Sequence, residues 1–109
     1  MVNSYEALHV IVQQALSDFA DDHSEAAIAF EIPKDMPEGA CALANAVNRK
    51  KAVFILARFG DEYKVGYALY EPDELSKLQP VHLADVNHDE FDAAFVIRLI
   101  RDFLLDEPG

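Results

Sequence analysis

Disulfide partners, basic charge and long apolar stretches are all scarce in this 109-residue sequence. Its single cysteine, Cys41, has no second cysteine to pair with, which excludes an internal disulfide and favours a reducing compartment. No uncharged stretch reaches the length of about 18 residues that a membrane helix needs, and no basic segment leads into an apolar run as in an export signal. We therefore expect a cytoplasmic protein that does not enter a membrane.

Basic residues are few: nine lysines and arginines stand against 20 acids, which gives a net charge of −11. The charge is uneven, with −7 over residues 1–48, +3 over residues 49–70 and −7 over residues 71–109. A surface of this sign repels nucleic acid and anionic lipid over about a Debye length. The composition therefore argues against nucleic-acid and membrane binding. It favours a basic protein partner, or no partner at all if the acids serve only solubility.

Sequence motifs with a known chemistry are also missing. The chain has no Walker loop, no GxGxxG, no CxxC pair and no GxSxG elbow. Apolar residues make up 51% of the chain, which is enough to build one core, and 109 residues have no room for a second. The sequence predicts a single acidic domain over residues 1–109, without a cofactor.

Apolar residues at helical spacing predict a long helix at each end of the chain. The first runs from Ser4 to about Phe19 and starts at a capping box of Asn3 and Glu6, with Ser4 as the alternative N-cap. Acids oppose the dipole at a helix C-terminus, so this helix is expected to stop before Asp21. The last helix is predicted over residues 91–105, after a capping box of Asn87 and Glu90.

The middle of the chain predicts strands and two further helices. A strand is predicted over 26–32, followed by a helix from the capping box Asp35–Glu38 to Asn48. A hairpin of strands 52–59 and 63–70 comes next. After it we expect a short helix over 74–78 and a segment 81–86 that fits either a strand or irregular chain. The expected fold class is α+β: a small mixed sheet of three to four strands, packed with two long terminal helices and one middle helix. The order would be helix, strand, helix, strand, strand, short helix, helix, with the second strand of the hairpin half exposed at an edge of the sheet.

Imidazole and carboxylate side chains recur at short intervals near the start of the last helix. His82, Asp85, His88 and Asp89 could together hold a hard or borderline divalent cation. The alternative is structural, because acids in the first turn of a helix are favoured by its dipole and no established metal-ligand motif is matched.

Two features around the predicted middle helix could carry chemistry. Cys41 would be an activated nucleophile if it lay at the positive end of that helix, or an inert thiol if it lay in the core. Arg49, Lys50 and Lys51 could bind a phosphate or carboxylate group, or they could simply follow the preference of a helix C-terminus for cations.

His9, inside the first helix, has no partner in sequence and is expected to be a boundary or surface residue.

Three tyrosines on one hairpin strand carry the functional hypothesis that we favour. Tyr63, Tyr67 and Tyr70 are of a type enriched at protein interfaces, and an edge strand can pair with its own copy. The same side chains could also lie under the helices as part of the core. The sequence favours a non-catalytic interaction protein that associates with itself, as a homodimer.

Two alternatives remain open. An acidic inhibitor or immunity-type protein would place its carboxylates on the basic site of a partner, and its affinity would fall with added salt. A small metal-dependent enzyme would use the segment from His82 to Asp92, and it would show bound metal on elemental analysis of the purified protein.

Overall fold

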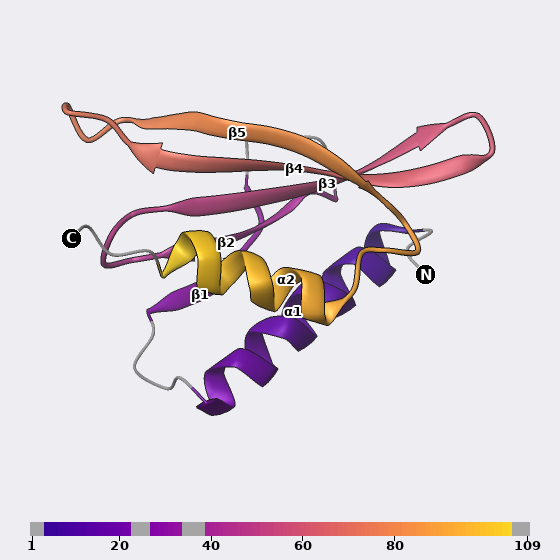
Figure 1. The fold of residues 1–109 in the computed structure, drawn as a ribbon, viewed down its shortest axis with the longest axis horizontal. Coiled ribbons are helices and arrows are strands. Elements are labelled where there is room, and N and C mark those ends of the chain that lie inside the picture. The colour runs from indigo at the N-terminus through magenta and orange to yellow at the C-terminus, as the bar shows by residue number, and fades with distance from the viewer. Residues whose placement is uncertain (1–3, 23–26, 34–38, 106–109) are drawn as a thin grey trace.

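The structure, a computed structural model, describes residues 4–22, 27–33 and 39–105 of the chain. An antiparallel sheet forms one layer of the fold and two helices form the other, with the longer helix preceding the sheet in the chain and the shorter one following it (Figure 1). In chain order the elements are α1 (Tyr5–Asp22), β1 (Ile28–Glu31), β2 (Cys41–Asn45), β3 (Lys51–Phe59), β4 (Glu62–Pro72), β5 (Leu78–Asn87), α2 (Ala93–Leu99) and η1 (Ile100–Leu104), a π-helical continuation of α2.

The five strands lie in the sheet in the order of the chain, and each pairs antiparallel with the next. Both helices lie on the same side of the sheet and pack against each other (Figure 1). The predicted mixed sheet of three to four strands with a middle helix is therefore wrong, because β1 and β2 are antiparallel neighbours and β5 is a full strand. Within the described ranges, no helix is long and apolar enough to cross a bilayer.

The core lies between the sheet and the two helices. Alternation along the strands turns one set of side chains toward the helices, and α1 and α2 each contribute a stripe at helical spacing. Burial of one such leucine or phenylalanine side chain stabilises the fold by about 1.5–3 kcal/mol. The buried cluster consists of Leu8, Val12, Ala15 and Phe19 from α1, Cys41, Leu43, Ala52, Phe54, Val65 and Leu69 from the sheet, and Phe91, Val96, Ile100 and Leu104 from the C-terminal segment.

Helix α1 starts close to its predicted position but runs further. The backbone N–H of Ala7 donates to the Ser4 hydroxyl oxygen at 3.1 Å, which satisfies one of the free donors of the first turn. The helix continues to Asp22, past the expected stop before Asp21, with no basic residue in its last turn. An unfavourable dipole interaction costs only about 0.3–1 kcal/mol, less than burial of Phe19 contributes near this end. Asn3 lies outside the described residues.

The hairpin of β3 and β4 is confirmed. Phe59 pairs with Glu62, so that Gly60 and Asp61 form the turn, and Gly60 has φ +64°, which glycine adopts without strain. Strand β4, however, lies between β3 and β5, so the prediction that it is an edge was wrong. The edge strand on this side of the sheet is β5.

Strand β2 occupies the position of the predicted middle helix. Four of its five residues are buried, and its side chains reach both faces of the sheet. A strand buried on both faces shows a continuous apolar run without alternation, and in an alanine-rich segment that run resembles a helix. The predicted capping box of Asp35 and Glu38 lies outside the described residues.

A tight turn replaces the predicted short helix over 74–78. The Asp73 carboxylate accepts hydrogen bonds from the N–H groups of Leu75 (2.8 Å) and Lys77 (2.9 Å), and the N–H of Asp73 donates to the carbonyl of Lys77 at 2.8 Å. Ser76 adopts φ +64° inside this turn. An aspartate that binds nearby backbone N–H groups competes with helix formation, so β4 turns directly into β5.

The C-terminal helix begins at a different cap from the one expected. The Asp92 carboxylate accepts from the N–H of Phe95 at 2.9 Å, which makes Asp92 the N-cap in place of Asn87. At the far end, the carbonyl of Leu104 accepts from the side-chain amides of Asn45 (2.9 Å) and Asn48 (2.7 Å). The turn after β2 thus caps the last helical segment and fixes it against the sheet.

Candidate interaction surface

The sheet has a second face, which points away from both helices. We call it the open face, and its residues on the three long strands alternate with the core residues of those strands. On β3 and β4 they are small or apolar in the middle and charged only toward the ends. The open-face positions of the three strands include Lys51, Val53, Ile55 and Ala57 on β3, Glu62, Lys64, Gly66, Ala68, Tyr70 and Pro72 on β4, and Leu78, Pro80, Leu83, Asp85 and Asn87 on β5.

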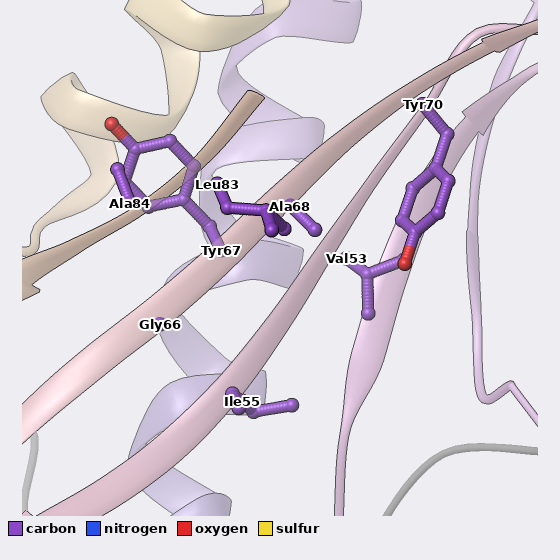
Figure 2. A pocket seen from close by; sticks show the side chains of 8 residues that line it. All are labelled: Val53, Ile55, Gly66, Tyr67, Ala68, Tyr70, Leu83 and Ala84. Atoms are coloured by element: carbon purple, nitrogen blue, oxygen red, sulfur yellow. The ribbon is translucent and has the colours of Figure 1, made fainter. Parts of the chain in front are cut away.

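A hollow of about 250 Å³ lies in the middle of the open face (Figure 2). Its lining is almost entirely apolar. Gly66 has no side chain and therefore leaves space beside the side chain of Ile55. A Cβ atom added to Gly66 would lie 3.1 Å from Cγ1 of Ile55, which is a tight contact. The lining residues are Val53, Ile55, Gly66, Tyr67, Ala68, Tyr70, Leu83 and Ala84.

Exposure rises across the open face from β2 to β5. Ala42 on β2 and Val53 on β3 are buried, at 0% and 4% exposure, whereas Leu83 on β5 is 71% exposed. Ile55, Gly66 and Ala68 are intermediate. The accessible part of this face therefore lies over β3, β4 and β5, and its most exposed apolar side chain stands beside the hollow.

Strand β5 adds further apolar exposure along the edge of the sheet. Every residue from Leu78 to Leu83 is exposed, including the large hydrophobic side chains of Leu78 and Val81. Leu75, in the turn before β5, is exposed as well. Within the described residues β5 pairs only with β4. A long apolar edge strand either binds a partner or promotes aggregation.

Two features keep the β5 edge from pairing freely with another strand. Pro80 has no N–H group to donate, and proline is tolerated mainly at edges and bulges. Leu69 pairs with His82 and Tyr70 with Pro80, so Val81 is left over as an extra residue that breaks the register. Proline and bulges are common means of blunting an edge strand against addition of a further strand.

The four predicted metal ligands point in different directions. His82 lies on the helix side of β5, with its ring 6.0 Å from that of Tyr67, whereas Asp85 pairs with Gly66 and lies on the open face. His88 follows the strand and donates its backbone N–H to the Tyr63 carbonyl, and Asp89 is exposed. In the part of the chain that the structure describes, no three histidine, cysteine or acidic side chains are grouped as metal ligands.

The three basic residues after β2 also diverge. They follow strand β2 and not a helix, so the preference of a helix C-terminus for cations does not explain their position. Arg49 lies in the turn with φ 66°, and the Lys50 ammonium lies 5.1 Å from the centre of the Phe103 ring. Lys51 forms a salt bridge with Glu31 across the open face. Each of the last two cations is held by a separate protein group, and the structure does not bring the three together around one anion.

The three tyrosines are divided between the two faces of the sheet. Tyr67 lies under α2, with its ring 5.6 Å from that of Phe95, and Tyr63 lies 5.9 Å below the Arg58 guanidinium. Both are on the helix side of β4, and Tyr67 packs against the buried core. Tyr67 and Tyr70 both line the hollow, but of the three tyrosines only Tyr70 has its side chain on the open face.

Cys41 and His9 are both engaged in the structure of the core. Burial raises the pKa of the Cys41 thiol to about 12, so the side chain remains protonated near neutral pH. The His9 Nε2 atom lies 2.6 Å from the carbonyl of Gly39, and its ring contacts that of Phe30 edge-on. His9 thus connects α1 to β1 and to the segment before β2, whereas Cys41 lies within the buried core.

Sequence reasoning did not identify Leu83, Ile55 and Gly66 as surface residues of interest. For Leu83 a weak signal was present, because large apolar residues recur between Leu75 and Leu83 without a regular period of a helix or a strand. Comparison with known proteins adds no candidate, because no protein-family model, no curated protein and no solved structure matches this chain.

Proposed function

We propose that this chain is a non-catalytic protein-interaction module that associates with a second copy of itself through the open face and strand β5. The observation that carries the proposal is the accessible apolar surface on β3–β5, with a hollow beside the exposed Leu83, in a chain whose net charge is −11. Apolar surface of this kind, surrounded by charged residues, marks interaction sites in proteins. A cytoplasmic location, expected from the lone cysteine, belongs to the same proposal.

The size of the surface suits a weak, specific dimer. Strands of 9, 11 and 10 residues, at about 3.4 Å per residue and about 4.8 Å between strands, give β3–β5 a face of roughly 500 Å². Two copies would then bury about 1,000 Å², which is near the lower limit for a specific interface. Association should accordingly depend on protein concentration.

Charge favours a second copy over other partners. Across the open face of β1 and β3–β5, the charged side chains are Glu31, Lys51, Glu62, Lys64 and Asp85, with a net charge of −1. A strongly basic or strongly acidic partner would gain little there and would be attracted or repelled by other surfaces. Two copies can approach at this nearly neutral face while their acidic surfaces remain apart.

The test is the oligomeric state over a concentration range of about 1 to 500 μM, where weak interfaces dissociate. Sedimentation velocity of the full chain should show a monomer that converts to a dimer. Leu83→Asp should shift the dissociation constant upward at least tenfold. Val10→Asp is the matched control, because Val10 is 58% exposed but lies on α1, away from the open face.

Salt distinguishes this proposal from the inhibitor hypothesis. High salt screens the repulsion between two chains of charge −11, so the dimer should persist or become tighter. A complex with a basic partner would instead weaken. A chain that remains monomeric at the highest concentration, or a dimer that Leu83→Asp leaves unchanged, would rule out the proposed function.

A further inference from the structure

The open face carries both a projecting apolar side chain and an apolar hollow, side by side. Leu83 is 71% exposed, and it also belongs to the rim of the 250 Å³ hollow next to Gly66 and Ala68 (Figure 2). Leu83 and Ala68 are paired residues on neighbouring strands. A two-fold axis brings the same patch of two subunits together, so a patch with both a projection and a recess can fit its own copy.

From this arrangement, and resting on the self-association proposed above, we infer that two copies meet sheet face to sheet face and that Leu83 of each copy enters the hollow of the other. The sheets would pack about 10 Å apart with interdigitated side chains, as in β-sandwiches. Strand β5 of one copy does not extend the sheet of the other.

The hollow is large enough for this side chain. A cavity of about 150 Å³ can hold a benzene molecule, so 250 Å³ accommodates the four carbon atoms of a leucine side chain. Gly66 and Ala68 supply the space, because neither projects beyond a methyl group, and the lining offers apolar atoms from Val53 and Ile55. Burial of an exposed leucine side chain on each copy is favourable by the hydrophobic effect.

The edge of β5 argues against the other way of joining two sheets. Continuous pairing of β5 with its copy needs regular N–H donors along the strand, and Pro80 supplies none. The extra residue at Val81 interrupts the register in the same place. The exposed apolar side chains of β5 can instead pack against the open face of a second copy. Such packing does not depend on a continuous row of backbone hydrogen bonds.

Disulfide trapping tests the arrangement directly. Leu83→Cys and Ala68→Cys chains are prepared separately, mixed at a concentration where the wild type is dimeric, and oxidised with diamide. The face-to-face dimer should give an inter-chain disulfide between them, because a bridge requires Cα atoms about 4.4–6.8 Å apart. The native Cys41 is buried and protonated, so it does not compete.

Two control positions separate the possible outcomes. His82→Cys lies on the helix side of β5, and Val10→Cys lies on α1, so neither should form an inter-chain disulfide. Trapping at His82 but not between Leu83 and Ala68 would indicate edge-to-edge pairing and would overturn the inference while the proposed function survived. A wild type without any dimer would remove both proposals.

A variant that fills the hollow supplies a second readout. Gly66 does not adopt a positive φ, and the tight contact made by an added methyl group is with a side-chain atom of Ile55, which can move. Gly66→Ala should therefore fold while the dissociation constant of the dimer rises about tenfold. A folded Gly66→Ala protein with unchanged dimerisation would contradict the inference, and circular dichroism with the unfolding midpoint establishes that the variant folds.

Discussion

The two faces of the sheet differ although the same strands build both. On the helix side, Phe54 is fully buried and its ring lies 5.7 Å from that of Phe91, whereas its neighbour Ile55 on the open face is only half-buried. The sequence of β3 does not distinguish the two faces by polarity here, because Phe54 and Ile55 are both large and apolar. A strand that is apolar on both sides thus marks two packing surfaces, and the helices among the described residues cover one of them.

The two faces also differ in what their side chains can do. The helix face carries a single buried thiol and a network of asparagine amides that hold the last helical segment, and all of these serve stability. The open face carries the accessible hollow and the exposed Leu83. Under the proposed function, stability depends on the helix side and self-association on the open face, so substitutions on each side should have separable effects.

Thiol reactivity should show the largest contrast between the faces. With its pKa raised from 9.0 to about 12, the Cys41 thiol should hold about a thousandfold less thiolate than an unperturbed cysteine near neutral pH. A cysteine introduced by Leu83→Cys lies on the exposed side of the monomer and should react at an ordinary rate at a concentration below dimerisation. Iodoacetamide labelling of the two sites, followed by mass spectrometry, measures the ratio, and rapid labelling of native Cys41 would contradict its burial.

The same shift predicts a loss of stability at high pH. As pH rises above about 9, the unfolded chain loses its thiol proton while the folded chain, with a pKa of about 12, keeps it. The unfolded state is therefore favoured progressively between about pH 9 and pH 12. Cys41→Ala should remove this part of the pH dependence, which urea unfolding at several pH values would detect.

Truncation of neighbouring residues on β3 compares the packing of the two faces. Phe54→Ala should lower the free energy of unfolding by about 3–5 kcal/mol, because it leaves a cavity between the sheet and α2. Ile55→Ala should cost about 1 kcal/mol in the monomer, since half of that side chain is already in water. Urea unfolding at a concentration below dimerisation measures both, and equal losses would mean that the open face is packed in the monomer.

Truncation of the two asparagines that donate to the end of η1 should lower the free energy of unfolding by an intermediate amount. Asn45 is 7% exposed, donates to the Leu104 carbonyl and accepts from the N–H of Val47, so Asn45→Ala should cost about 1–3 kcal/mol. Asn48→Ala is the matched control: Asn48 is half-buried, donates to the same carbonyl and accepts from the N–H of Lys50, so its truncation should cost less. The difference in unfolding midpoints measures the contribution of burial.

The parts of the fold that could be predicted from the sequence are those whose pattern is complete within one segment. Helix α1 shows a full apolar stripe, and the β3–β4 hairpin has a glycine turn between two β-rich runs. Strand β2 could not be separated from a helix, because a strand of Cys-Ala-Leu-Ala-Asn with both faces buried has no alternation. Its assignment depends on β1 and β3 on either side, which local sequence does not specify.

Strand β5 was ambiguous for a different reason. The extra residue at Val81 shifts the alternation by one position, so no single period of two runs from Leu78 to Asn87. The segment before it, Glu71-Pro72-Asp73-Glu74, also suits a turn into a short helix. Because β5 provides Leu83, the same irregularity also hid the candidate surface, and the tyrosines of β4 were the signal that the sequence offered for self-association.

The smallest effect is expected at the charged end of the open face. Lys51 and Glu31 form a salt bridge with side-chain exposures of 24% and 42%, and a partly exposed pair contributes only about 0–1 kcal/mol. Lys51→Met, which keeps the aliphatic stem, should therefore change the unfolding free energy of the monomer by less than about 1 kcal/mol. Lys50→Met is the companion variant on the helix side, where the ammonium lies over the Phe103 ring. Measurements at low and high salt should converge for Lys51→Met and wild type, because salt screens an exposed pair, and a loss well above 1 kcal/mol would show that this end of the open face is as tightly packed as the core.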